Sequence, residues 1–142
     1  MMLVLASLYA LPVYSCPDAP GFGDFPISTK GCPAPAKNLE ELSPELAGAE
    51  PGATQANFAQ CWHVTEISCG TSCAQIALTH LPTGEQFSGP VATVGATFRV
   101  NSRLLVLNPA ENIVEAFGNS PPEWAVTEHF VLQLDGTLEQ VR

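Results

Sequence analysis

The chain has 142 residues, enough for one domain around a single hydrophobic core. Apolar residues make up 46% of it, which excludes wholesale disorder, and 14 acidic residues against 5 basic ones give a formal net charge of −9. An acidic surface repels nucleic-acid phosphates and anionic lipid head groups, so we expect no nucleic-acid partner and no direct membrane binding.

The N-terminal stretch predicts export. Residues 3–13 carry no charged side chain. A membrane-spanning helix needs about 20 apolar residues, so this run is too short to span a bilayer, and its length is typical of the core of a secretory signal peptide. Pro12 ends any helix there. Cleavage after Ser15 places Val13 and Ser15 at positions −3 and −1 of the cleavage site, where signal peptidases require small residues. We predict a signal peptide over residues 1–15; the alternative is a buried N-terminal strand or helix.

Cleavage after Ser15 would make Cys16 the first residue of the mature chain. Residues 13–16, Val-Tyr-Ser-Cys, resemble the lipobox of bacterial lipoproteins, in which the cysteine receives the lipid. That resemblance implies lipidation at Cys16. Each buried methylene of an acyl chain contributes about 0.8 kcal/mol, so several chains would anchor the domain firmly. Lipidated and unlipidated forms both stay open at this point.

Residues 16–56 predict an irregular arm, because proline and glycine recur and interrupt helices and interior strands. A short docked piece is expected at residues 22–27. Ser43 as N-cap, Pro44 at the first helical position and Gly48 as the stop predict one or two helical turns. Three leucines at helical spacing support that short helix (Leu39, Leu42 and Leu46).

From residue 57 to the C-terminus, period-two alternation and β-forming residues predict strands. They are expected at 58–67, 74–81, 85–88, 97–107, 113–117, 124–134 and 137–141. Asn108-Pro109 ends the longest of them, and Asp135-Gly136 is a strong hairpin signal. Short strands at this spacing with no long helix predict a mainly β fold, an antiparallel meander forming a small sandwich or open barrel.

The five cysteines suggest a disulfide framework. Cys69 and Cys73 flank a three-residue turn, where paired strands bring them within reach of a structural disulfide. An odd number of cysteines leaves at least one outside any disulfide within the chain, and in an exported protein that one needs an explanation. If Cys16 carries a lipid, Cys32 is left to pair with Cys61; without a lipid, Cys16–Cys32 becomes the easier local pair and Cys61 stays free.

Two interpretations give the cysteines a chemical role in place of structural disulfides. A metal site could use Cys61, His63, Cys69 and Cys73 as sulfur and nitrogen ligands, but their spacing matches no standard zinc finger or ribbon. We therefore predict no metal ligand and no cofactor.

A thiol–imidazole pair of Cys61 and His63 is the second interpretation. Side chains two apart on a strand point in parallel, whereas a base must come within about 3 Å of its nucleophile. His80 and His129 are candidate partners from other strands, and no known catalytic motif is present. We predict no catalytic residue.

We expect core packing for each of Trp62, Trp124 and Phe130; the alternative is an aromatic binding surface formed by the three.

Several segments resemble a family of small bacterial exported proteins and lipoproteins. They are Asp24-Phe25-Pro26-Ile27, Asn57-Phe58-Ala59, the turn at residues 69–73 (Cys-Gly-Thr-Ser-Cys) and residues 103–108 (Arg-Leu-Leu-Val-Leu-Asn). The resemblance implies an exported β domain and no particular reaction. Where the family has Gly-His-Tyr, this chain has Gln60-Cys61-Trp62, so a role of that histidine does not carry over unless His63 replaces it.

The sequence therefore predicts an exported envelope protein, either in the periplasm or, if Cys16 carries a lipid, anchored to the outer membrane. It would act as a non-enzymatic binding or structural module, and its ligand or protein partner stays unidentified. The alternative is a metal-binding or thiol-dependent enzyme of the envelope that uses Cys61 and His63.

Overall fold

The computed structural model describes residues 19–47 and 54–142. The predicted signal peptide, Cys16 and the predicted helix stop at Gly48 lie outside these residues. No helix within the described ranges is both long enough and apolar enough to cross a membrane.

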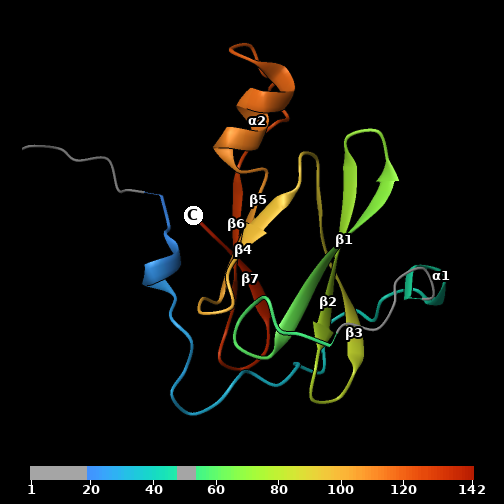
Figure 1. Ribbon diagram of the computed structural model, residues 1–142, viewed down its shortest axis with the longest axis vertical. Coiled ribbons are helices and arrows are strands. Elements are labelled where there is room, and N and C mark those ends of the chain that lie inside the picture. The colour runs from blue at the N-terminus through green and yellow to red at the C-terminus, as the bar shows by residue number, and fades with distance from the viewer. Residues whose placement is uncertain (1–18, 48–53) are drawn as a thin grey trace, which may run out of the picture.

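The strands form two antiparallel sheets, which confirms the predicted mainly β class (Figure 1). The first sheet has the order β1-β2-β3 and the second the order β4-β5-β6-β7. Within each sheet the strands therefore pair with their neighbours in sequence, and the described strands close no barrel. The bounds are β1 Trp62–Gly70, β2 Cys73–His80, β3 Glu85–Ala92, β4 Ala96–Phe98, β5 Leu104–Leu107, β6 Glu128–Leu132 and β7 Leu138–Val141.

The main core lies between the two sheets. Trp62 is fully buried there with side chains of the first sheet, and Leu105, Leu107 and Leu132 come from the second. Because side chains of a strand alternate between faces, each sheet also has an outer face, and both outer faces carry apolar residues that need a cover.

The arm covers both outer faces. Its first part is the 3₁₀ helix η1, Phe22–Asp24, whose Phe22 packs with Phe25 against the outer face of the second sheet at Leu104, Val106 and Val131. Its later part includes α1, Pro44–Ala47, and there Leu42 and Leu46 pack on Ile67 and Ala77 of the first sheet. Figure 1 shows the arm running from one sheet to the other between these two docking points.

Only part of the predicted helix in the arm forms. Ser43 accepts hydrogen bonds at its carbonyl from the Leu46 and Ala47 N–H groups, and the helix is limited to Pro44–Ala47. Leu39 packs instead on the core between the sheets. Ahead of the helix the chain is extended, because the Leu42 N–H donates to the Gln86 carbonyl at the edge of β3 (3.0 Å).

Two strand predictions are wrong in detail. The strand expected at residues 113–117 is part of a helix, α2, Ala110–Phe117, with Ile113 as its buried residue. Alanine and glutamate favour helix here, and the proline at position 109 suits a helix start.

The strand expected at 97–107 is divided into β4 and β5 by a turn. Ser102 is buried in that turn, where its hydroxyl donates to the Phe22 carbonyl (2.8 Å). The predicted hairpin at Asp135-Gly136 is confirmed between β6 and β7.

Candidate functional site

Two disulfides join four of the cysteines. Cys32 is bonded to Cys61 with their Cα atoms 5.9 Å apart, and Cys69 is bonded to Cys73 with a Cα separation of 5.0 Å. The sequence predicts these two pairs for a chain with a lipid on Cys16, and Cys16 itself lies outside the described residues. The first bond fastens the arm to the start of β1, and the second closes the β1–β2 turn.

The histidine beside Cys61 in the sequence is not its partner in space. The Nδ1 atom of His63 lies 2.7 Å from the Gln55 carbonyl oxygen. Cys69 and Cys73 lie at the opposite end of the β1–β2 hairpin. The sulfur and nitrogen set considered from the sequence is therefore not assembled.

A different histidine lies at the arm disulfide. His80 at the end of β2 is the register partner of Trp62, and one of its ring nitrogens and the sulfurs of Cys32 and Cys61 lie within 4.8 Å of one another. His80 is buried, and its ring lies 5.0 Å from the Trp62 ring between centroids.

Burial lowers the pKa of His80, because it penalises the charged imidazolium more than the nearby Glu85 carboxylate favours it. The ring Nδ1 is 2.9 Å from Thr83 Oγ1, which fixes the ring orientation. His80 is thus a largely neutral imidazole at neutral pH, held beside two sulfur atoms.

The sequence contains a signal that could have found His80. Once Cys69 and Cys73 are placed opposite each other across their turn, counting outward along the two strands sets Trp62 opposite His80. The arm cysteine that completes the cluster is separated from Cys61 by 29 residues, and nothing local predicts that contact.

The three aromatic residues proposed as one surface lie apart. Trp62 is fully buried, and its Nε1–H donates to the Pro33 carbonyl in the arm (3.0 Å). Trp124 is 59% exposed and meets Phe117 of α2 edge to face at 5.5 Å. Phe130 is half-buried on β6. A single aromatic surface is therefore wrong, because the core takes up Trp62.

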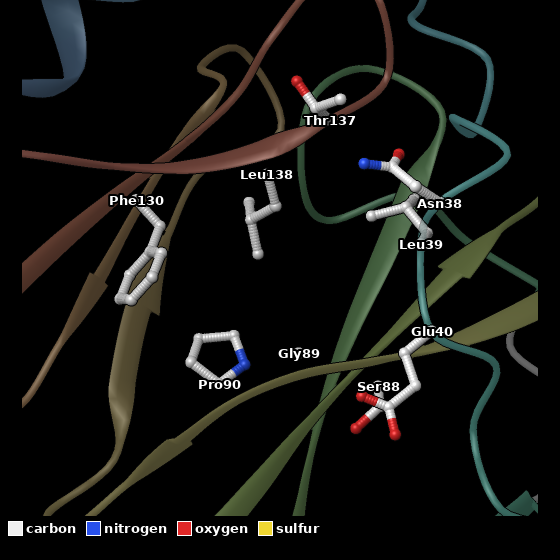
Figure 2. Close-up of a pocket in the computed structure, with 9 residues that line it drawn as sticks. All are labelled: Asn38, Leu39, Glu40, Ser88, Gly89, Pro90, Phe130, Thr137 and Leu138. Atoms are coloured by element: carbon white, nitrogen blue, oxygen red, sulfur yellow. The ribbon is translucent and has the colours of Figure 1, made fainter.

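A cleft of about 250 Å³ lies between the arm, β3 and β7. Figure 2 shows Phe130, Leu138 and Pro90 bordering the open space, with Asn38 and Glu40 of the arm on another side. Apolar walls and one carboxylate thus meet in a single depression, and no basic side chain lines it. The remaining lining residues are Leu39, Ser88, Gly89 and Thr137.

The cleft borders a free strand edge. β7 is the last strand of its sheet, and the Gln133 N–H donates to the Thr137 carbonyl (2.8 Å) to close the hairpin. Alternate residues of an antiparallel pair bond to the partner strand, so Leu138 and Gln140 direct their backbone N–H and C=O groups to the open side.

The edge of β3 on the same cleft is already occupied. The Ser88 N–H donates to the Glu40 carbonyl of the arm (2.8 Å), and Pro90 has no N–H to offer. Of the two strands that border the cleft, β7 alone offers a free edge.

A second, more apolar groove of about 400 Å³ lies on the outer face of the second sheet, beside Phe22. Its floor includes Thr97, Val106 and His129, which are register partners on β4, β5 and β6. His129 therefore lies on the outer face of a sheet, away from the cysteine cluster of the first sheet. The sequence predicted neither hollow, because each is built from residues far apart along the chain.

Comparisons of the chain with protein-family models, with curated proteins and with solved structures find no match.

Proposed function

We propose that the protein is an exported, lipid-anchored binding module that holds an extended, positively charged peptide segment of another envelope protein along β7. The observation that carries this proposal is the free edge of β7 beside a cleft whose one charged lining residue, in the described parts of the chain, is Glu40. In this mode, backbone hydrogen bonds to an unpaired strand supply affinity and side-chain pockets supply specificity.

Export is supported by the signal-peptide pattern and by the two disulfides, since disulfides persist in oxidising compartments. Two bonds in a chain of 142 residues are compatible with a protein outside the cytoplasm. The lipobox-like residues 13–16 support attachment through Cys16.

The size and charge of the cleft favour a peptide side chain over a free small molecule. Its volume of about 250 Å³ lies below the roughly 300–1,000 Å³ of ordinary small-molecule pockets. The apolar walls suit the methylene stem of lysine or arginine, and Glu40 suits the charged end. The net charge of −9 attracts basic partners as a whole.

Labelled ten-residue peptides test the binding mode. One alternates valine with lysine, a second alternates valine with glutamate, and a third is the lysine peptide with every second backbone nitrogen methylated. We expect the lysine peptide to bind and the other two to bind at least ten-fold more weakly, because they lose charge complementarity or edge hydrogen bonds. Equal binding of the methylated peptide would contradict strand addition.

Matched variants locate the site. Glu40→Gln should weaken binding of the lysine peptide several-fold, while Glu45→Gln should not, because Glu45 lies on α1 outside the cleft. Gln140→Pro removes an N–H that faces the open side of β7 and should abolish strand addition without breaking the ladder to β6. Circular dichroism checks that each variant is folded.

Intact mass of protein purified from cell envelopes, without reduction, tests the anchor. We expect loss of residues 1–15 and a mass increase from acyl chains on Cys16. A mature chain with an unmodified Cys16 would overturn the anchor and leave the binding proposal to the peptide experiment.

A further inference from the structure

We propose that the Cys32–Cys61 disulfide, once reduced, becomes a zinc site with two thiolate ligands and His80 as the third ligand. The ligand atoms of these three residues lie within 4.8 Å of one another. Zinc–sulfur distances of about 2.3 Å and zinc–nitrogen distances of about 2.0 Å place tetrahedral ligands roughly 3.5–3.8 Å apart. The three groups thus already lie near the separations that zinc requires, and the sulfurs have only to part from bonding distance.

His80 is held in place independently of the disulfide. It belongs to β2, lies opposite Trp62 in the register and contacts the Trp62 ring. Thr83 Oγ1 holds its Nδ1 at 2.9 Å, which leaves Nε2 for a metal. Zinc-binding histidines commonly bond their other ring nitrogen to a fixed partner in this way, which orients the ring.

The second disulfide provides an internal comparison. Cys69 and Cys73 are also joined, but within the described parts of the chain no histidine or carboxylate completes a three-ligand group around them. The arm disulfide differs because the arm crosses the end of β2, where His80 lies. Water would fill the fourth position, since two thiolates and one imidazole supply three ligands.

The conversion needs a reductant of the dithiol class. A dithiol transfers two electrons and two protons to the Cys32–Cys61 bond, is itself oxidised to a disulfide, and leaves two thiols. Zinc then displaces one proton from each thiol and binds both thiolates, and the two protons pass to solvent.

The experiment uses the chain with Cys16, Cys69 and Cys73 changed to serine, so that Cys32 and Cys61 supply its only thiols. Zinc affinity is measured by competition with a chromophoric chelator, before and after dithiol reduction. We expect one zinc ion per reduced chain and none per oxidised chain. Cobalt, bound in place of zinc, should show thiolate charge-transfer absorption.

His80→Asn should lower the zinc affinity of the reduced chain at least ten-fold. His63→Asn is the matched control and should leave the affinity unchanged, because His63 contacts the Gln55 carbonyl instead. If the reduced chain unfolds without metal, zinc should restore its β circular dichroism in the parent and in His63→Asn, but not at the same concentration in His80→Asn. Equal affinity in the His80 variant, binding by the oxidised chain, or no binding by the reduced chain would each overturn the proposal.

Discussion

At the scale of single residues, Asn108 joins three segments that are separate in the sequence. Its side-chain oxygen accepts hydrogen bonds from the Thr93 N–H (2.7 Å) and the Val94 N–H (2.9 Å), and its Nδ2 donates to the Val126 carbonyl (3.1 Å). It is buried and has a φ of 52°. Asparagine tolerates this left-handed conformation better than most residues, so both its backbone and its side chain suit the position.

Asn108→Ala should therefore destabilise the fold by about 2–4 kcal/mol, because two backbone N–H groups lose their acceptor and alanine is strained at positive φ. Asn108→Asp is the matched variant. Its protonated carboxyl keeps the acceptor for Thr93 and Val94 and a donor for Val126, so in acid its cost should be smaller than that of alanine, whereas at pH 7 the buried charge adds a penalty. Urea unfolding in acid measures both, and an alanine variant as stable as the aspartate variant would contradict this role.

Asp135 gives the β6–β7 turn a pH dependence. Its Oδ1 accepts hydrogen bonds from the Thr137 hydroxyl (2.6 Å) and the Thr137 N–H (3.0 Å), and these lower the pKa of the carboxyl. The folded state therefore binds the proton less tightly than the unfolded state, where the pKa is about 3.9. Its stabilising effect is complete above that pH and is lost as the pH falls through the folded pKa.

Asp135→Asn, which cannot titrate, isolates this effect. The difference in melting temperature between the parent and Asp135→Asn should stay constant from pH 7 to pH 5. Toward pH 3 the melting temperature of the parent should fall relative to that of the variant. Thr137→Val removes the hydroxyl donor, which is the largest cause of the lowered pKa, and should reduce that shift. A difference that does not change with pH would contradict the assignment.

At the scale of elements, the sequence correctly predicted those turns and strands whose conformation depends on neighbouring residues. Asp135-Gly136 gave a correct hairpin because the loop between Gln133 and Thr137 needs a residue that accepts positive φ, and Gly136 has a φ of 84°. The helix α2 was missed because a short Ile-Val pair fits a strand as well as a helix. The turn at Ser102 depends on bonds to Phe22 and Phe25, nearly 80 residues away, which no local pattern contains.

The candidate sites also combine features that neighbouring residues predict with contacts between distant segments that they do not. The turn at residues 69–73 predicted the Cys69–Cys73 pair, whereas Cys32–Cys61 was one of two alternatives that depended on a lipid at Cys16. The register set by the β1–β2 turn would have placed His80 opposite Trp62. The cleft could not be predicted, because Glu40, Phe130 and Leu138 meet only after the arm has crossed between the sheets.

Gly136 also marks where the arm touches the second sheet. The Ala36 N–H donates to the Gly136 carbonyl (3.3 Å), and a Cβ on Gly136 would overlap the Ala34 carbonyl oxygen. Gly136→Ala should therefore cost several kcal/mol, more than the roughly 1–2 kcal/mol of positive-φ strain alone.

Gly84→Ala is the control for Gly136→Ala, because Gly84 has a similar φ of 73° in a β turn but open space around it. Thermal unfolding of the two variants separates overlap from strain. Equal losses of stability would show that the arm moves away from residue 136 at little cost and that this contact does not stabilise the hairpin.

At the scale of the whole molecule, the arm links the two sheets and covers part of the outer face of each. It docks on the outer face of the second sheet through Phe22 and Phe25, is bonded to β1 through Cys32, and covers the outer face of the first sheet through Leu42. Each sheet has few strands and buries two faces, so neither could exclude water from its outer face without the arm. We expect the arm and both sheets to unfold together.

Trp62 reports on this cooperativity, because it is buried between the sheets and bonded to the arm at Pro33. With Trp124→Phe, Trp62 is the sole tryptophan. In urea, its fluorescence and the far-UV circular dichroism should change at the same midpoint. Replacing Cys32 and Cys61 with serine should cost about 3.5 kcal/mol on the chain-entropy model, against about 2 kcal/mol for Cys69 and Cys73, because the first bond closes the longer loop. A Trp62 transition that precedes the circular dichroism change in the disulfide-bonded protein would show that the arm detaches as a separate unit.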